Sequence, residues 1–308
     1  MKKNFLAVLL AVILVAALST VTASAAENEY EVGSAEEWDT VAEKIAQLPE
    51  GSEATVILTD DVGHSGEYKN AAKVMYVGVD GRHVTYKSSS EPTEEGVAGP
   101  FFITRLTSMY ANGDVTFENV WLNRSQSANR TQGTISSFYG CGHTIEFAEN
   151  FKSPIANIYG GSTDNVTGNP HLIINGDVTS WNYNSSAAET EVYGGGYYKS
   201  TSQKGKVTGN VTIDIREKSS FAWVYGGGYN AGIEGDITIN LEAAPNGTTA
   251  ATNNAGHIVG GGYVSDKGPT NGRDSGTVNG DITLNLHNGK FIGLNGGSVD
   301  QLVDMSPA

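Results

Sequence analysis

Four acidic side chains are the candidates for catalytic chemistry in this sequence: Asp60, Asp61, Glu118 and Glu146. Hydrolysis of a polysaccharide requires two carboxyl groups that face each other across a cleft. Asp60 and Asp61 end a short apolar segment, where aspartate commonly terminates a strand. Glu118 and Glu146 alternate with apolar residues, so strand geometry points them outward, where they could line a groove. This pattern is compatible with a hydrolase site near residues 60–146.

Two further patterns bear on catalysis. A polysaccharide lyase would need an acidic cluster that binds calcium and a base that takes a proton, and Arg82, His83 and Arg105 are the bases available. Cys141 and His143 stand two residues apart, which on a strand places both on one face. A thiol nucleophile needs a basic partner in contact with it. We prefer the interpretation of Cys141 as a small buried residue.

Five tyrosines at recurring positions are the predicted binding residues: Tyr193, Tyr197, Tyr225, Tyr229 and Tyr263. If the chain coils regularly, Tyr193 stacks on Tyr225, and Tyr197 stacks on Tyr229 and Tyr263. An exposed ladder of flat rings suits sugar rings, because each ring offers contact area at low entropy cost. The alternative is a ladder that packs against its own neighbours or against loops.

A short polar residue recurs directly after glycine, at Asp114, Asp177, Asn210, Asp236 and Asp281. A column of carboxylates could bind calcium, which takes oxygen ligands. A tight turn also needs glycine followed by a short polar side chain that bonds nearby backbone groups. The mixture of Asn and Asp favours the turn interpretation, so we predict no metal site and no cofactor, with calcium as the alternative.

The elements that must position these residues are one helix and many short strands. Residues 34–48 predict an amphipathic helix with Ser34 as its N-cap and Glu37 completing a capping box. Within a predicted N-terminal cap over 26–50, this helix would protect strand edges from pairing with other chains. Strands are expected at 54–58, 74–79, 83–86, 101–103 and 115–122, with a loop at 88–99.

A glycine-rich motif gives the second half of the chain a regular period. It recurs at positions 159, 193, 225, 259 and 294, at intervals of 34, 32, 34 and 35 residues. A near-constant period with loops of variable length is typical of a solenoid. The triple glycines indicate sharp corners or close approach of backbones. We therefore predict an all-β, right-handed parallel β-helix over 51–308, with clear repeats at 155–297.

The chain resembles the right-handed β-helix proteins with a pectin-lyase-like fold. The helix around Trp38, followed by the segment 55–62, is similar to their N-terminal cap and first coil, and 115–120 is similar to their recurring coil strand. The Val-Tyr-Gly-Gly-Gly-Tyr and Gly-Asp-Ile-Thr-Ile repeats resemble those of bacterial cell-surface, adhesin-like β-helix proteins. The resemblance covers about residues 30–297 and implies a fold and a compartment, but its motifs specify no chemistry.

The first 25 residues predict a cleaved signal peptide, with Lys2 and Lys3, an apolar run from Phe5 to Leu18, and a small-residue cleavage pattern at 23–25. Its removal changes the formal charge from −15 to −17 (−15 − 2), because it takes two lysines and no acids. Such a surface repels nucleic acid and anionic lipid. We expect a secreted protein, with no membrane insertion after cleavage.

Three functions are compatible with these observations. The leading hypothesis is an exported, non-catalytic β-helix that binds an extracellular polysaccharide or a cell-surface glycan at the bacterial surface. The second is a polysaccharide lyase or glycoside hydrolase that uses the four carboxylates. The third is a structural fragment of a larger surface protein.

Overall fold

The computed structural model describes residues 28–62, 74–89, 101, 103, 108–122, 134–178, 190–216, 219, 221, 223–242, 257–265, 276–287 and 293–300. The signal peptide predicted for residues 1–25 lies outside these ranges, as does most of the loop predicted at 88–99. No helix of the described residues is long and apolar enough to cross a membrane.

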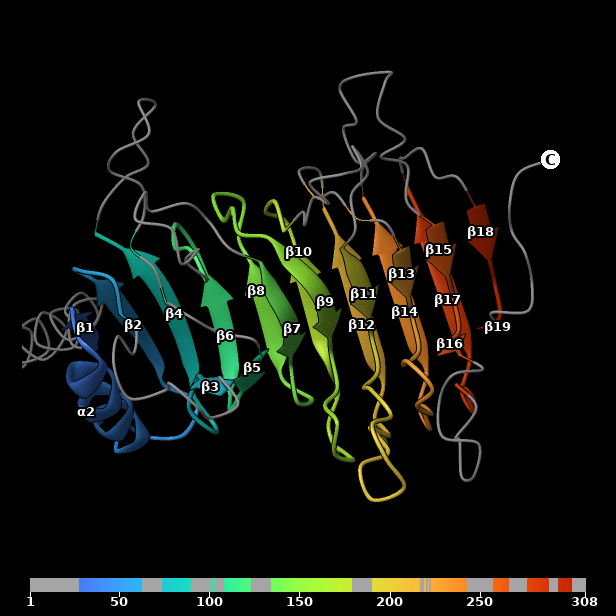
Figure 1. The fold of residues 1–308 in the computed structure, drawn as a ribbon, viewed down its shortest axis with the longest axis horizontal. Helices are drawn as coiled ribbons and strands as arrows, with labels where there is room; N and C mark the ends of the chain where they lie inside the picture. Colours follow the sequence, from blue (N-terminus) through green and yellow to red (C-terminus); the bar gives the residue numbers. More distant parts are fainter. Residues whose placement is uncertain are drawn as a thin grey trace, which may run out of the picture.

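Two parallel sheets run along the molecule, with strands from alternate halves of each coil (Figure 1). The first sheet contains, in order, β1 (Glu29–Val32), β2 (Glu53–Leu58), β4 (His83–Ser88), β6 (Asp114–Phe117), β8 (Thr144–Phe147), β10 (His171–Ile174), β12 (Val211–Ile215), β14 (Ile237–Leu241) and β17 (Ile282–Leu286).

The second sheet contains β3 (Val74–Val77), β5 (Ser108–Ala111), β7 (Ile135–Tyr139), β9 (Ile155–Tyr159), β11 (Glu191–Tyr193), β13 (Trp223–Tyr225), β15 (His257–Val259) and β18 (Gly293–Asn295). A further short pair joins β16 (Tyr263–Val264) to β19 (Val299–Asp300). Because the chain alternates between the two large sheets, each coil places its strands directly beside those of the previous coil. The chain is therefore a parallel β-helix, as predicted.

The main core fills the space between the two sheets. Every second residue of a strand points inward: Val211, Ile213 and Ile215 of β12 are buried, while Thr212 and Asp214 face outward. The opposite wall is supplied by residues such as Val192 and Val224 of the second sheet. Each fully buried aliphatic side chain contributes about 1.5–3 kcal/mol, so the stack of coils is stabilised along its whole length.

One helix covers the N-terminal end of the stack. Helix α2 (Ala35–Ala46) buries Trp38, Val41 and Ile45 against the first coils, and the Trp38 ring stacks on Tyr86 at 5.1 Å. Ser34 caps the helix by accepting a hydrogen bond from the Glu37 amide at 3.2 Å. The Glu37 carboxylate accepts from the amide of Gly33 at 2.7 Å, one residue before the amide that a standard capping box uses.

Glycines form the corners where the chain leaves the second sheet. A Cβ atom on Gly226 would lie 2.2 Å from the carbonyl oxygen of Gly260, and one on Gly194 would lie 2.3 Å from that of Gly226. Successive corners therefore stack backbone against backbone. This is the close approach that the triple glycines predict.

Several elements differ from the sequence-based prediction. Strands β1, β5 and β7 were not predicted, and β6 ends at Phe117 rather than continuing to residue 122. The last repeat is displaced by one residue, because Asn295, not Leu294, pairs with Val259. Of the strand predicted at 101–103, residues 101 and 103 are described, and Ile103 forms an isolated bridge with Val62.

Candidate functional site

The outer face of the second sheet carries a continuous stack of tyrosines. We call it the inner tyrosine row: Tyr76, Tyr110, Tyr139, Tyr159, Tyr193 and Tyr225 occupy one register position on successive strands. From Tyr110 onward, neighbouring ring centroids lie 4.6, 5.0, 4.9 and 4.8 Å apart with interplanar angles of 7–21°. Strand spacing sets this repeat, since adjacent strands lie about 4.8 Å apart.

A second set of rings lies over the later part of this stack. This outer tyrosine row consists of Tyr197, Tyr229 and Tyr263, which follow the triple glycines and lie 5.1 Å apart in sequence order. Each outer ring is steeply inclined to an inner ring, such as Tyr229 to Tyr193 at 5.9 Å and 74°. From Tyr110 onward, the two rows form an aromatic cluster separate from the main core.

The five predicted binding tyrosines thus fall into two classes. Tyr193 and Tyr225 stack on each other as predicted, but they are only 1% and 3% exposed and offer no ring face to solvent. The outer row is only partly buried. Trp223 adds a further partly buried ring on the same face, stacked on His257 at 3.8 Å and 12°. At this end of the sheet, the accessible aromatic surface is therefore the outer row together with Trp223, while Tyr76 is exposed at the other end.

Burial makes the inner row hard to ionise. It raises the pKa of Tyr139 to about 12 and holds the pKa of Tyr159 and Tyr193 well above the ordinary value of tyrosine. The Tyr193 hydroxyl donates a hydrogen bond to the Glu191 carboxylate at 2.6 Å. Tyr159, Tyr193 and Tyr225 therefore act as a neutral support for the outer rings that lie against them.

Sequence reasoning missed the first three inner-row members, Tyr76, Tyr110 and Tyr139. They stand outside the glycine motif that drew attention to the later tyrosines. An available signal was a tyrosine near the end of each short apolar segment, but the strands β5 and β7 that carry two of them were not predicted.

The four carboxylates predicted for catalysis do not meet as one group. Asp60 and Asp61 follow β2, whereas Glu146 lies on β8, three strands and roughly 14 Å along the sheet. Strand β6 is the neighbour of β8, and its residue Thr116 pairs with Glu146. Glu118 directly follows β6, two residues after Thr116. Only Glu118 and Glu146 are therefore brought to adjacent strands.

A polar network that the sequence did not predict crosses the outer face of the first sheet. His171 Nε2 lies 2.8 Å from Asp214 Oδ2, and the Asn240 side chain donates to the other Asp214 oxygen at 2.6 Å. Asn285 in turn donates to Asn240 at 2.8 Å. These side chains come from four successive strands. Asp214, Asn240 and Asn285 occupy the same variable position of the repeated Gly-Asp-Ile-Thr-Ile motif, whereas His171 stands outside that position.

Glu146 belongs to a similar group on the same face. It accepts a hydrogen bond from Thr116 at 3.4 Å, and the Thr116 hydroxyl lies 2.8 Å from His83 Nε2. Glu146 and Asp214 occupy the same register position with Ile173 between them, so their Cα atoms lie roughly 9.6 Å apart.

The environment of Asp214 keeps it ionised. Burial on its own raises the pKa of this carboxyl group, but hydrogen bonds from His171 and Asn240 outweigh it and bring the pKa below the ordinary value. Asp214 can therefore hold the His171 ring by accepting from Nε2, which leaves Nδ1 as the ring nitrogen available to other partners.

The polar residues after glycine bond the backbone of the next coil. Asn169, Asn210 and Asp236 each accept, at 2.9 Å, from the amide of the equivalent residue on the following coil. Two of the predicted members differ. Asp177 follows β10, and Asn169 takes its place in this ladder. Asp114 lies two register positions away from the ladder, and its side chain accepts a hydrogen bond from the amide of Thr144 at 2.8 Å.

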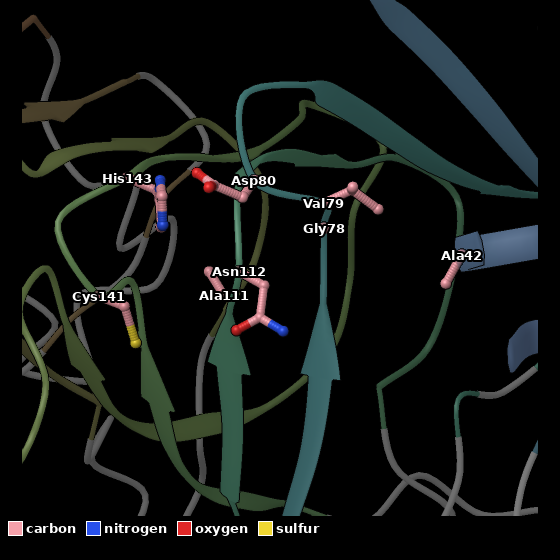
Figure 2. Close-up of a pocket in the computed structure, with 8 residues that line it drawn as sticks. All are labelled: Ala42, Gly78, Val79, Asp80, Ala111, Asn112, Cys141 and His143. Atoms are coloured by element: carbon pink, nitrogen blue, oxygen red, sulfur yellow. The ribbon is translucent and has the colours of Figure 1, made fainter. Parts of the chain in front are cut away.

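Cys141 and His143 line one recess (Figure 2). Burial raises the pKa of the Cys141 thiol, which also bonds Ser162 and the backbone of Ala111. His143 instead faces Asp114, with 3.9 Å between Nδ1 and Oδ1. A thiol with a raised pKa is a poor nucleophile at neutral pH. Cys141 is half-buried, not fully buried as its interpretation as a small core residue implied.

Within the described ranges, no three His, Cys, Asp or Glu side chains converge as metal ligands. No family model, curated protein or solved structure matches this chain. The function must therefore be argued from the two sheet faces themselves.

Proposed function

We propose that the protein is an exported, non-catalytic glycan-binding protein, adhesin-like in character, that binds an extracellular polysaccharide on the outer face of the second sheet. The observation that carries the proposal is the outer tyrosine row, in which the centroids of partly exposed neighbouring rings lie 5.1 Å apart. Three successive coils each contribute one ring, so the face offers repeated contacts to a repeating polymer.

The support beneath these rings favours binding to an extended chain. The inner tyrosine row and the stacked glycine corners hold the outer rings in place before any ligand arrives. A rigid aromatic surface loses little conformational entropy on binding. Several weak contacts along one polymer also raise the overall affinity through effective concentration.

The first experiment measures binding of neutral, acidic and amine-bearing polysaccharides to residues 26–308 by affinity electrophoresis. We expect Trp223→Ala and Tyr229→Ala each to weaken binding, by about 1–2 kcal/mol per ring, because each removes a stacking surface. Tyr76→Ala is the matched control. This variant also removes an exposed tyrosine of the second sheet. Tyr76, however, lies five strands and roughly 24 Å away from Tyr225.

Circular dichroism would confirm that the variants are folded. Equal affinity of the wild type and both ring variants would then mean that the glycan binds at another surface, and absence of binding by all three would mean that the protein binds none of these glycans. Loss of binding in the Tyr76 variant alone would move the site to the opposite end of the sheet. Each of these results contradicts the outer tyrosine row as the binding surface.

A polysaccharide hydrolase is the second candidate function, and the pairing of His171 with Asp214 near Glu146 is the observation that favours it. The same samples can be analysed for new reducing ends. Release of ends that is lost in both Glu146→Gln and Asp214→Asn, with thermal stability retained, would replace the binding proposal by this one. Absence of release on every polysaccharide leaves the binding proposal in place.

A further inference from the structure

The corners that leave the second sheet change in length along the molecule. In the early coils they are short and span 78–82, 112–113 and 140–143. The next two span 160–170 and 194–210. The long corners form an extra layer of backbone beside the sheets, and the short corners do not. The surface therefore has a step where the corner at 140–143 meets the corner at 160–170.

An open recess of about 510 Å³ lies over the short corners. Figure 2 shows Asp80, Asn112 and His143 projecting from three successive corners, with Ala42 of helix α2 at one edge and Cys141 at the other. Cys141 bonds Ser162, which belongs to the first long corner. The helix and the step thus close the recess from two sides.

We propose that this recess binds one or two units of a sugar that carries no acidic group. The proposal rests on the glycan-binding function above and adds a second, distinct subsite to it. A volume of this size lies within the range of about 300–1,000 Å³ for small-molecule sites. The recess is large enough for a sugar unit and too short for a long polymer to bind along its length.

The side chains of the recess match vicinal hydroxyl groups. The Asp80 carboxylate accepts hydrogen bonds, the Asn112 amide both donates and accepts, and a neutral His143 ring can do either. Asp80 and Asn112 are exposed. They can therefore exchange bonds to water for bonds to a ligand without breaking a buried network.

The charges around the recess select against acidic sugars. Asp80 lines it, Asp114 lies 3.9 Å from His143, and Asp164 acts electrostatically on Cys141. The whole chain carries a net charge of −15. A uronic acid or sulfated sugar would meet like charges, whereas a neutral or amine-bearing sugar would not.

The recess is also continuous with the aromatic cluster. Cys141 packs against the inner tyrosine row, to which Tyr110 belongs, and the Tyr110 hydroxyl bonds Thr163 in the first long corner. The recess therefore borders the aromatic cluster at Cys141.

Cys141 provides a direct reporter, because it is the only cysteine in the chain. We would measure the rate of its alkylation by iodoacetamide, with and without cellobiose, a glucosamine disaccharide or digalacturonate, and the affinity of each sugar by calorimetry. We expect cellobiose or the glucosamine disaccharide to bind and to slow alkylation severalfold, and digalacturonate to do neither.

Variants locate the site. Asp80→Ala and Asn112→Ala should each weaken disaccharide binding at least about tenfold, because each removes hydrogen bonds to the sugar. Glu31→Ala, which removes an exposed acid from β1 on the first sheet, should leave the affinity unchanged. Trp223→Ala should weaken the binding of long polymers and leave disaccharide binding unchanged.

The outcomes separate the two proposals. If polymers bind through Trp223 but no disaccharide binds or protects Cys141, the recess proposal is overturned and the proposed function stands. If Asp80→Ala weakens disaccharide binding but Trp223→Ala leaves polymer binding unchanged, the recess proposal is supported and the proposed binding surface on the outer tyrosine row is overturned. If the folded wild type binds no sugar at all, both are overturned. Equal binding of digalacturonate would overturn the charge selection.

Discussion

At the scale of single residues, the tyrosines show how one residue type serves two purposes on one face. From Tyr139 to Tyr225, rings of the inner row lose nearly all contact with solvent. Stacking between neighbouring rings adds about 0.5–1.5 kcal/mol per pair beyond burial. Rings of the outer row keep part of their surface accessible. The difference is set by position in the coil, since the inner residues lie on strands and the outer ones follow the glycine corners.

The buried hydroxyls predict a characteristic response to alkali. Tyrosine ionises near pH 10 in an unfolded chain, but burial raises the pKa of Tyr139 to about 12 and those of Tyr159 and Tyr193 well above 10. Above pH 10 the unfolded chain has therefore released protons that the folded chain retains. The free energy of unfolding is unaffected below pH 10 and falls as the pH rises through the raised pKa values.

Ultraviolet difference spectroscopy measures this response, with circular dichroism to follow unfolding. We expect one group of tyrosines to ionise only above pH 10, together with the loss of structure. Tyr193→Phe keeps the ring stack and should remove one tyrosine from the late phase. Titration of every tyrosine near pH 10 in the folded state would contradict the burial of the inner row.

At the scale of elements, the corners decide how closely the coils stack. Gly194, Gly226, Gly260 and Gly296 occupy equivalent places in successive corners, and each of the first three lies against the carbonyl oxygen of the next. A side chain at these places would push neighbouring coils apart. The requirement is steric, because none of the four has the positive φ angle that favours glycine.

Gly226→Ala should therefore destabilise the protein by about 1–3 kcal/mol, the usual effect of overpacking a close contact. Gly296→Ala is the matched control. It stands at the same place in the last described coil, where an added Cβ meets no atom within 4 Å. Urea denaturation measures both variants, and we expect the control to lie within about 0.5 kcal/mol of the wild type. Equal destabilisation of the two would refute the steric explanation.

The sequence predicted these elements unevenly. The helix, strands β2, β3, β4 and β6, and the glycine corners were recognised because each has a local signal: an N-cap with apolar spacing, alternation bounded by turns, or a repeated motif. Asn169 was missed because Pro170 replaces the Val or Ile of the motif, and Asp177 was chosen in its place. The structure shows that Asn169, not Asp177, is the equivalent residue, because His171 pairs with Thr212 and the Asn210 amide donates a hydrogen bond to the Asn169 side chain.

At the scale of the whole molecule, the two ends of the solenoid are unlike. Helix α2 buries Trp38, Val41 and Ile45 against the first coils. In the last strands the inward-facing residues are less covered: Ile282, Leu284 and Leu286 are only partly buried, and Leu294 is 46% exposed. Solenoid stability is approximately a sum of repeat and neighbour terms, so coils with fewer contacts open more readily.

Hydrogen exchange should reveal this gradient. We expect the hydrogen-bonded amides of β12 and β14, which have a strand on either side, to exchange more slowly than those of β17 and β18 at the end of each sheet. Mass spectrometry of peptides from the exchanged protein measures the rates strand by strand. Uniform protection from β12 to β18 would contradict the expected weakness of the last coil.

The sequence by itself determined the class of fold and its period. The alternation of apolar and polar residues, the helix cap and the spacing of the glycine motif are local properties that can be recognised in a single sequence. It also placed Tyr193 over Tyr225, because a constant period stacks equivalent residues. Only the tertiary structure decided which tyrosines are covered and that His171 meets Asp214 across 43 residues of sequence. Burial and cross-strand pairing depend on the register between coils and on which residues cover each sheet face. Both arise from contacts between distant segments, so no single segment of the sequence determines them.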